Sequence, residues 1–306
     1  MTAALIIASG KTSGRKKFEP EKIIGTISAL ERITLLFQKA GIRRIVVVCD
    51  EDSQVKKLVP CMNLTFLPTP PGGDMLDSIK TGLQYLQGKC ENVLISYVDV
   101  PMFSVRTIQT LLEAGGELCA PSYHGRHGHP VLLPIKYAAQ ILAYEGDGGL
   151  RGATKACGIE RRFIEVDDPG IISDIQRDNS YKKLLATHDV AKLHVTSQFQ
   201  IGKECSFYDP GVHHLMKLTE ELGSLAEACR YVGISYSKGR KIVHTIEEQL
   251  GSSVIESQQG GRGGGFSRLT DEAKDIMKCY DAFCEEAEAA VEKLFEKHFA
   301  TQIEKE

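Results

Sequence analysis

The chain has 306 residues, 42% of them hydrophobic, and a formal net charge of −3, which is an ordinary globular composition at a length typical of two domains. No apolar run approaches the roughly 20 residues that a membrane-spanning helix needs, and the short apolar start is not a signal peptide. Nine scattered cysteines without a Cys-x-x-Cys pair favour reduced thiols. We therefore expect a cytoplasmic protein without zinc, haem or a membrane partner.

Apolar runs alternate with helical patterns over the first two hundred residues, which predicts an α/β fold with a mostly parallel, Rossmann-like sheet. The domains are expected at 1–190 and 212–306, joined by a linker at 191–211 that sustains no period. Strands are expected at 3–8, 45–48, 64–67, 92–101, 118–121, 129–134 and 162–166, and helices at 27–40, 74–86, 107–114, 137–143 and 179–186.

A polar, glycine-containing loop from Ala8 to Gly14 follows the first strand. Its backbone N–H groups could surround phosphates, as such loops do in nucleotide-binding proteins. Gly10-Lys11-Thr12 is not part of a P-loop, because Leu5 stands where that motif requires its first glycine. On these residues alone, a plain strand-to-helix connection explains the loop equally well.

Asp99 ends the apolar run 92–101 and is followed two residues later by Pro101. Ligands of open α/β sheets bind beyond the carboxyl ends of the strands, where a carboxylate is well placed to hold a divalent cation. The alternative is an aspartate that caps a turn or a helix. His124, His127 and His129 also lie close together in sequence, but without a neighbouring Cys or carboxylate they do not predict a metal site.

These elements resemble the MobA-like nucleotidyltransferases, which include molybdopterin cytidylyl- and guanylyltransferases. The resemblance covers about residues 3–186 and implies a nucleotidyltransferase fold. It also implies the magnesium-dependent transfer of a nucleotide to a substrate phosphate, with release of pyrophosphate. The segments that carry it are LIIASG, GxIS with Leu30-Glu31-Arg32, AGIRRIVVV, DSIKTGL, VDVPMF, GHPVLL, GDGGLRGA and SDIQRDNSY.

The resemblance also implies roles for particular residues. Asp99 would be the catalytic residue and a magnesium ligand, with Asp174 as a second ligand, while Gly128, His129 and Pro130 would shape the side of the second substrate. The nucleotide would contact the loop after the first strand and a lysine beyond it: Ala8, Ser9, Gly10, Lys11, Thr12, Ser13 and Lys17.

Three positions depart from the pattern of that family. Gly14 and Glu19 stand where the family has an Arg and a Lys, and Gln176 replaces the second carboxylate of an Asp-x-Asp motif. Phosphoryl transfer depends on positioned positive charge, and one unit charge at ~4 Å is worth about 4 kcal/mol at an effective dielectric near 20. Arg15, Lys16 and Lys17 are candidate replacements. We therefore expect a nucleotidyltransferase fold with an eroded active site.

Residues 223–270 predict a helix-turn-helix followed by a glycine-rich wing. Ser224 and Glu227 form a capping box, Gly233 permits a tight turn, and Ser235 caps a longer second helix. An ordinary helical hairpin with a solvated basic face is the alternative. In the helix-turn-helix interpretation, the residues that face a major groove are Ser235, Tyr236, Ser237, Lys238, Arg240 and Lys241.

This segment resembles the winged helix-turn-helix of the LysR type, and most of all that of the molybdate-responsive, ModE-like repressors. The basis is GISYSKGRKIVHTIEEQLG, an apolar strand and then QGGRGGGFSRLT. The resemblance implies double-stranded DNA as a partner, with Arg262 of the wing on a phosphate. Between Arg230 and Arg268, six Lys or Arg stand against three Glu, so a local excess of +3 lies within a chain of net charge −3.

The stretch 270–299 contains neither Pro nor Gly and predicts one long helix. Apolar residues recur along it at alternating spacings of four and three, which is typical of a coiled-coil seam and predicts a homodimer. A single amphipathic helix that packs on its own domain is the alternative. The seam residues are Ile276, Tyr280, Phe283, Ala287, Ala290 and Leu294.

The sequence thus favours a DNA-binding transcriptional regulator whose α/β domain binds a nucleotide or a molybdopterin-type ligand, linked to molybdenum cofactor metabolism. Because the chain ends at Glu306 without a further domain, we expect any ligand sensing to come from the first two hundred residues. An active CTP or GTP:molybdopterin nucleotidyltransferase that also binds DNA is the alternative. A scaffold without ligand or operator is the third hypothesis.

Overall fold

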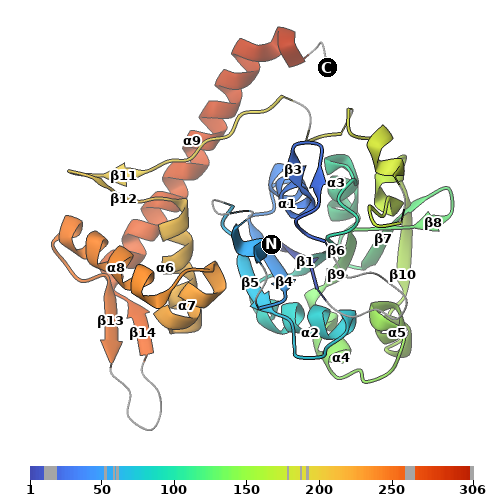
Figure 1. Ribbon diagram of the computed structural model, residues 1–306, viewed down its shortest axis with the longest axis horizontal. Helices are drawn as coiled ribbons and strands as arrows, with labels where there is room; N and C mark the ends of the chain where they lie inside the picture. The colour runs from blue at the N-terminus through green and yellow to red at the C-terminus, as the bar shows by residue number, and fades with distance from the viewer. Residues whose placement is uncertain are drawn as a thin grey trace. The chain divides into compact units, whose positions relative to one another are not determined.

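A computed structural model describes residues 1–9, 19–51, 54–57, 59, 62–177, 179–186, 188–190, 193–258 and 266–303. The chain divides into two compact units, one made of residues 1–60 and 64–191 and the other of residues 61–63 and 192–306. The first unit is a sheet covered by helices, and the second consists of helices with two short hairpins (Figure 1).

The central sheet of the first unit has the strand order β10-β7-β9-β6-β1-β4-β5, with β8 paired to β7. β1, β4, β5 and β6 are mutually parallel, whereas β9 runs antiparallel to both β6 and β7. The expected α/β fold with a mostly parallel sheet is confirmed. The strands are β1 (Thr2–Ile7), β4 (Arg44–Cys49), β5 (Thr65–Pro68), β6 (Asn92–Tyr97), β7 (Leu118–Tyr123), β8 (Arg126–His127), β9 (Val131–Pro134) and β10 (Arg161–Glu165).

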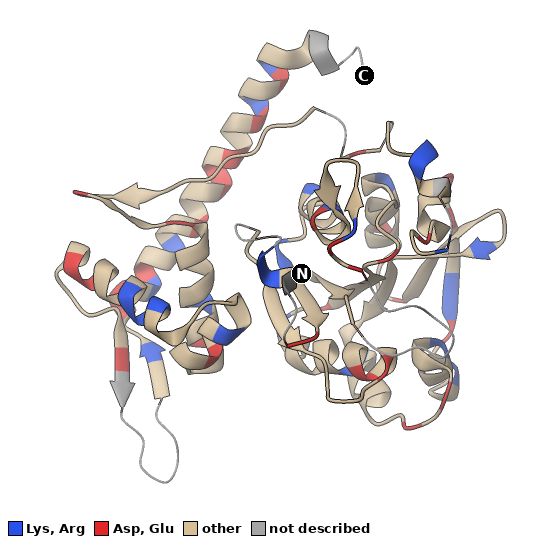
Figure 2. Ribbon diagram, in the orientation of Figure 1, with Lys and Arg blue, Asp and Glu red and all other residues tan. Residues whose placement is uncertain are grey.

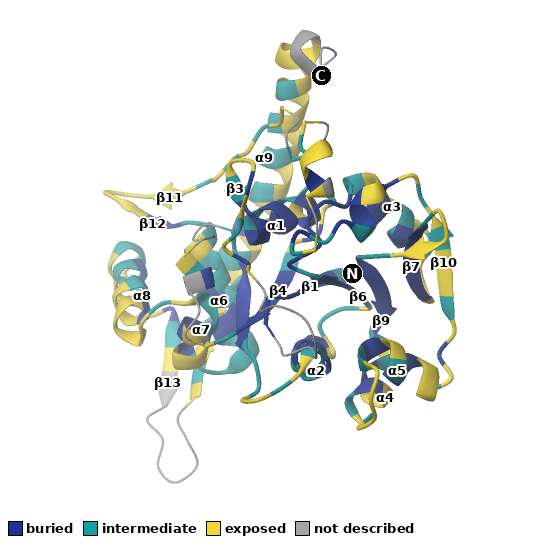
Figure 3. Ribbon diagram, turned by 45° about the vertical axis from the view of Figure 1, so that its right-hand side comes forward, coloured by how far each residue is buried: buried dark blue, intermediate teal, exposed yellow. Residues whose placement is uncertain are grey.

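Helices cover both faces of this sheet, with α1 and α3 on one face and α2, α4 and α5 on the other (Figure 1). The middle strands are buried on both faces, as Figure 3 shows for β1, β4 and β6, and most of their residues are apolar. α2 lies directly on β1 at Gly82, where the Leu5 side chain leaves no room for a Cβ. The helices are α1 (Ala29–Lys39), α2 (Met75–Leu86), α3 (Val105–Glu113), α4 (Ala138–Leu142) and α5 (Gly149–Ala156).

The structure differs from the expected elements of this unit at several places. The helix expected from residue 27 begins at Ala29, because Ser28 is its N-cap and Ile27–Ser28 (β3) pairs with Ile23–Ile24 (β2). The strand expected over 92–101 ends at Tyr97, and α5 was not expected as a helix. Short 3-10 turns occur at Gln54–Lys57 (η1), Ile135–Tyr137 (η2), Pro169–Ile172 (η3) and Ser180–Lys183 (η4), the last within the helix expected over 179–186.

The second unit packs its helices α6, α7, α8 and α9 around a small apolar core. Two helices, α7 and α8, lie where the sequence led us to expect a shorter and a longer helix, and the apolar faces of α6, α7, α8 and α9 supply buried residues such as Leu215, Leu225, Val243 and Ala273. The elements are β11 (Ile201–Gly202), β12 (Ser206–Tyr208), α6 (Pro210–Leu222), α7 (Leu225–Val232), α8 (Tyr236–Leu250), β13 (Ile255–Gln258), β14 (Phe266–Leu269) and α9 (Asp271–Ile303).

Local capping fixes the turn between α7 and α8. The Ser224 hydroxyl accepts a hydrogen bond from the Glu227 N–H at 3.2 Å, which is the serine half of the predicted capping box. Gly233 ends α7 in the left-handed conformation at φ 86°, and the Ser235 hydroxyl accepts from the Lys238 N–H at 3.2 Å. α7 and α8 then cross closely, because at Gly239 the Cys229 sulfur occupies the space of a Cβ.

The segment expected as a linker, 191–211, contains structure of its own. β11 and β12 form an antiparallel hairpin within it, and α6 begins at Pro210. No helix in the described part of the chain is both long enough and apolar enough to cross a membrane.

Candidate functional site

Asp99 lies at the point where the strand order of the sheet reverses. From β1 the chain builds outward through β4 and β5, and then returns to place β6 on the other side of β1. The Val98 N–H donates to the Ile7 carbonyl oxygen at 3.1 Å, so Asp99 follows directly at the carboxyl edge between β1 and β6. Such a reversal opens a crevice where α/β sheets bind ligands. The Asp99 residue is 2% exposed and therefore lies beneath that edge.

Residues 168–175, the crossing segment, bring Asp174 beside Asp99. The Ile175 N–H donates to the Asp99 carbonyl oxygen at 2.9 Å. Gly170 packs against the backbone that follows Asp99, because the Met102 carbonyl occupies the space that a Cβ at position 170 would need. The two aspartates assigned to a metal by resemblance are thus neighbours through the backbone, although 75 positions separate them in sequence.

The Asp174 carboxylate also organises its own turn. Its Oδ1 accepts from the Gln176 N–H at 2.9 Å, and its Oδ2 lies 3.0 Å from the Arg177 Nε. Among the described residues, no three His, Cys, Asp or Glu side chains are grouped to hold a metal. Two carboxylates nevertheless suit Mg²⁺, which commonly takes one or two protein carboxylates and completes its shell with water and substrate phosphates.

Gly128, His129 and Pro130 reach the same edge because β9 is antiparallel to β6. Ile95 of β6 pairs with Val131 of β9, so the residues that precede β9 meet the carboxyl end of β6. The His129 ring packs edge-on against the Tyr97 ring, with centroids 4.4 Å apart. The His129 N–H donates to the Ile171 carbonyl oxygen at 2.9 Å, and that carbonyl leaves no room for a side chain at Gly128. The crossing segment therefore joins Asp99 and His129 in one site.

Two arginines that the sequence did not single out are Arg151 on α5 and Arg161 on β10. Burial lowers the pKa of the Arg161 guanidinium, the positive charge of Arg151 lowers it further, and Tyr97 acts in the opposite direction. The Arg161 Nη2 lies 3.5 Å from the Thr154 hydroxyl on α5. Arg161 is the first residue of β10 and so lies away from the carboxyl edge of the sheet, and we assign the two arginines no part in the site.

The predicted nucleotide loop is only partly described. Ala8 and Ser9 are buried, and the Ser9 hydroxyl hydrogen bonds with the Thr69 hydroxyl and with the Val48 carbonyl oxygen at 3.4 Å. The Ser9 side chain is thus engaged with β4 and β5. The remaining residues of that prediction, Gly10, Lys11, Thr12, Ser13 and Lys17, lie outside the described residues, as do Gly14, Arg15 and Lys16.

Lys22 is a further cation at this edge that sequence reasoning missed. Its Nζ donates to the Ile175 carbonyl oxygen at 2.5 Å and lies 5.9 Å from the centre of the Tyr181 ring. No periodicity or motif links position 22 to position 175, so the sequence offers no signal for this contact. Glu19, which occupies the position of the family lysine, is exposed.

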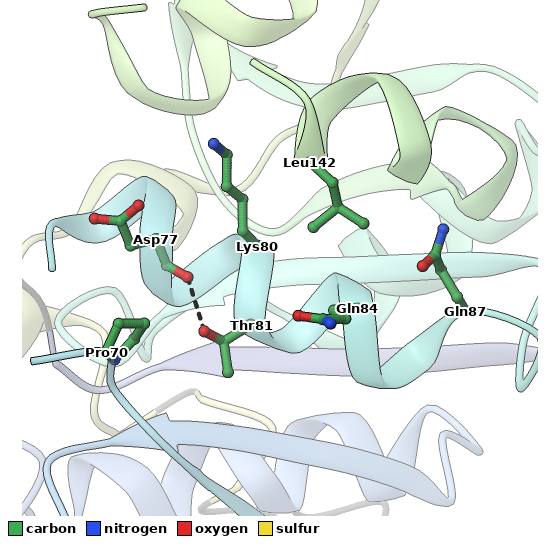
Figure 4. Close-up of a pocket in the computed structure, with 7 residues that line it drawn as sticks. All are labelled: Pro70, Asp77, Lys80, Thr81, Gln84, Gln87 and Leu142. Carbon is green, nitrogen blue, oxygen red and sulfur yellow. Dashed lines mark hydrogen bonds between the residues drawn. The ribbon is translucent and has the colours of Figure 1, made fainter. Parts of the chain in front are cut away.

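A shallow groove of about 420 Å³ runs along α2 (Figure 4). The Thr81 hydroxyl within it donates to the Asp77 carbonyl oxygen at 3.0 Å, and Lys80 donates to the Tyr144 carbonyl oxygen. It includes none of the residues around Asp99, so we assign it no part in the site. Its lining residues are Pro70, Asp77, Lys80, Thr81, Gln84, Gln87 and Leu142.

In the second unit, the residues predicted to read DNA lie on one exposed surface. The opposite side of α8 is buried through Gly239, Val243 and Ile246. β13 and β14 pair in register from Ile255 with Leu269 to Gln258 with Phe266, whereas Arg262 lies outside the described residues. Figure 2 shows Lys and Arg gathered at the start of α8 and on β14. The exposed residues are Ser235, Tyr236, Ser237, Lys238, Arg240 and Lys241.

Comparison with solved structures places the first unit among nucleotidyltransferase folds. A nucleotidyl transferase from Methanothermobacter thermautotrophicus is 16% identical, with a TM-score of 0.51 over 61% of this chain and 97% of that one. The Mycobacterium tuberculosis protein Rv0371C in complex with manganese is 15% identical, with a TM-score of 0.48 over 61% and 98%. The 4-diphosphocytidyl-2C-methyl-D-erythritol synthase of Anaerococcus prevotii is 15% identical, with a TM-score of 0.49 over 57% and 91%.

No curated protein matches the chain. The model of the MobA-like NTP transferase domain matches residues 4–161, which contain most of the sheet, Asp99 and the residues before β9. Because this match covers more than half of the 306 residues, the chain belongs to the family of MobA-like NTP transferase domains.

Proposed function

We propose that the chain is a DNA-binding transcriptional regulator whose MobA-like domain binds a nucleoside triphosphate or a molybdopterin-type ligand. The observation that carries the DNA-binding part is the asymmetry of α8. Its buried side packs on α7 at Gly239, while Tyr236, Arg240 and Lys241 stand exposed on its other side. A recognition helix needs this division, because one side must fix it to the domain while its first turns enter a major groove.

The β13–β14 hairpin supports the same assignment. It follows α8 directly in the chain, and Arg268 on β14 is exposed. Basic charge is concentrated there although the chain as a whole carries −3. Lys and Arg on a wing would contact phosphates without reading bases, and would make binding depend on salt.

A homodimer through α9 is part of the proposal, with a seam shorter than the sequence suggested. Tyr280 is 3% exposed and its hydroxyl donates to the Phe199 carbonyl oxygen at 2.8 Å, while the Phe283 and Phe199 rings lie 5.3 Å apart. The first part of the expected seam thus packs on its own unit. Leu294 and Phe299 are 55% and 43% exposed, and we propose that they pair with a second copy. Two recognition helices roughly 34 Å apart would then read a palindromic site.

The proposed ligand site is the edge around Asp99. Asp99 and Asp174 would hold Mg²⁺, which would offset the charge of a bound triphosphate. The His129 ring, which packs beside Tyr97, would line the side of a second ligand. Gly14 and Glu19 remove positive charge that transfer would need, whereas binding tolerates such losses better because it requires no transition-state stabilisation.

The second candidate is an active CTP or GTP:molybdopterin nucleotidyltransferase that also binds DNA. The juxtaposition of Asp99 and Asp174 through the Ile175 backbone favours it, because it brings together the two aspartates to which the resemblance assigns a metal. A link to molybdenum cofactor metabolism belongs to both candidates, since it rests on the resemblance of both halves of the chain.

The test of DNA binding uses the full chain and a site selected from random duplexes. We expect Arg240→Ala to weaken binding of that site about 10- to 100-fold, because a base contact is worth about 1–3 kcal/mol. Arg106→Ala, at an exposed arginine on α3, is the matched control and should bind as the wild type does. Equal affinity of the wild type and the Arg240 variant would refute the assignment of α8.

Ligand dependence separates the two candidates. A regulator predicts that a magnesium nucleotide changes DNA affinity without release of pyrophosphate. An active transferase predicts pyrophosphate release in the presence of molybdopterin, lost in Asp99→Asn. If the protein shows no ligand-dependent DNA affinity and no pyrophosphate release, that result would count against a functional role of the first unit.

A further inference from the structure

Lys22 is placed at the candidate site by a chain of two hydrogen bonds. Its Nζ donates to the Ile175 carbonyl oxygen at 2.5 Å, and the Ile175 N–H donates to the Asp99 carbonyl oxygen at 2.9 Å. A single residue spans roughly 3.5 Å, so the ammonium lies within roughly 9 Å of the Asp99 backbone. The positive charge of Lys22 therefore lies at the edge of the sheet that carries Asp99 and Asp174.

The backbone of Lys22 is fixed on both sides. Its N–H donates to the Glu19 carbonyl oxygen at 3.0 Å, and its carbonyl oxygen accepts from the Ala29 N–H, the first residue of α1, at 2.9 Å. The side chain is half-buried and lies above the Tyr181 ring, 5.9 Å from its centre. Much of the rotamer entropy that a lysine loses on binding an anion is already lost in this arrangement.

The ammonium also has donors to spare. A lysine carries three N–H donors, and among the described residues the Ile175 carbonyl is its one hydrogen-bond acceptor. Glu19, by contrast, is exposed and carries the opposite charge to the lysine that the family has at its position. Within the described part of the segment that follows the predicted nucleotide loop, Lys22 is therefore the positively charged residue that reaches the Asp99 edge.

We propose that Lys22 is a phosphate-positioning residue of the nucleotide site, and that it supplies the positive charge that Glu19 does not. This inference rests on the proposed binding of a nucleoside triphosphate at the Asp99 edge. The competing role for Lys22 is a purely structural one, in which its contact with Ile175 ties the crossing segment to α1. The two roles differ in their dependence on the number of phosphates in the ligand.

The chain contains a matched control for the structural role. The Lys39 Nζ on α1 donates to the Asp189 carbonyl oxygen at 2.6 Å, so it too joins α1 to the C-terminal part of the unit through a backbone carbonyl. Lys39 is the last residue of α1, whereas Lys22 precedes the start of that helix, and the Lys39 bond goes to Asp189 rather than to the crossing segment. Replacing Lys39 should therefore lower the stability of the unit to a similar extent without changing its affinity for phosphate groups.

The test measures affinity by calorimetry for CTP, GTP, ATP and UTP with Mg²⁺, and for the corresponding monophosphates. We expect Lys22→Met to weaken the preferred triphosphate about 10- to 100-fold, the usual range for a lost hydrogen bond between charged groups. Monophosphate affinity should change less than threefold, Lys22→Arg should retain most of the triphosphate affinity, and Lys39→Met should change neither.

Asp99→Asn distinguishes failure of this inference from failure of the proposed site. If Asp99→Asn weakens triphosphate binding and Lys22→Met does not, the nucleotide site stands and the role of Lys22 is refuted. Equal weakening of triphosphate and monophosphate by Lys22→Met, together with a lower melting temperature, would show a structural tether and also refute it. Absence of wild-type binding to all four triphosphates would refute the nucleotide site and the inference together.

Discussion

The crossing of α7 and α8 at Gly239 makes a sharp prediction, because a methyl group there would occupy the space of the Cys229 sulfur. Both residues are buried, Cys229 being 1% exposed. Overpacking of this kind costs about 1–3 kcal/mol, whereas replacing Gly by Ala inside a helix gains up to about 1 kcal/mol. We expect Gly239→Ala to lower the local stability of the two helices by about 1–2 kcal/mol.

A double-mutant cycle separates the clash from the helix propensity. Cys229→Ala removes the sulfur, so Gly239→Ala placed in that background should regain most of the loss, with a coupling energy of about 1–2 kcal/mol. Hydrogen–deuterium exchange of peptides from α7 and α8 measures the local opening free energy, which avoids treating a two-unit chain as two-state. Additive effects of the two substitutions would refute the close crossing.

Two further predictions concern the first unit. Burial and, after it, the charge of Arg32 lower the pKa of His188 below 6.5 in the folded chain, so this histidine binds a proton more readily in the unfolded chain. The free energy of unfolding should therefore decrease as the pH falls from 6.5 through the folded pKa. His188→Gln should flatten this pH profile, measured as hydrogen-exchange protection in α1 and α3. Asp168→Asn should cost about 1–3 kcal/mol, because the carboxylate accepts from the Ser104 N–H and the Thr107 hydroxyl at 2.7 and 2.6 Å. The melting temperature should fall for this variant and stay unchanged for Asp167→Asn, at an exposed neighbour; equal shifts would contradict the buried role of Asp168.

Features that depend on neighbours in sequence were predictable. Both faces of a parallel strand are buried, so β1 and β4 read as unbroken apolar runs. Serine before a helix and glycine after it act through backbone groups within four residues, and Ser235 and Gly233 were therefore identified correctly. Asp99 was placed at the end of its strand for the same reason, although its role as a ligand stays a prediction.

Features that join distant segments were not predictable from pattern. The antiparallel direction of β9 follows from the path of the chain after β8, and β9 itself is as apolar as the parallel strands of the sheet. The contact of Lys22 with Ile175 spans 153 positions, and the docking of Phe199 against α9 spans more than 80. A lysine in a loop and an aperiodic stretch of chain carry no local signal for such contacts, so the linker was expected to lack structure.

The ion pair between Asp174 and Arg177 bears on the metal site that we propose. The Arg177 side chain is 63% exposed, and an exposed pair of this kind stabilises by about 0–1 kcal/mol. A divalent cation that arrives with a triphosphate interacts with the Asp174 carboxylate through two charges, which exceeds what the arginine gives up. The ion pair therefore weakens the binding of a cation by the Asp174 carboxylate but does not prevent it. With Gln176 in place of a second carboxylate, the cation would be held less rigidly. This change should reduce catalysis, which needs a rigidly held cation, more than it reduces nucleotide binding. The geometry around Asp174 thus favours a domain that still binds a magnesium nucleotide over one that still transfers it.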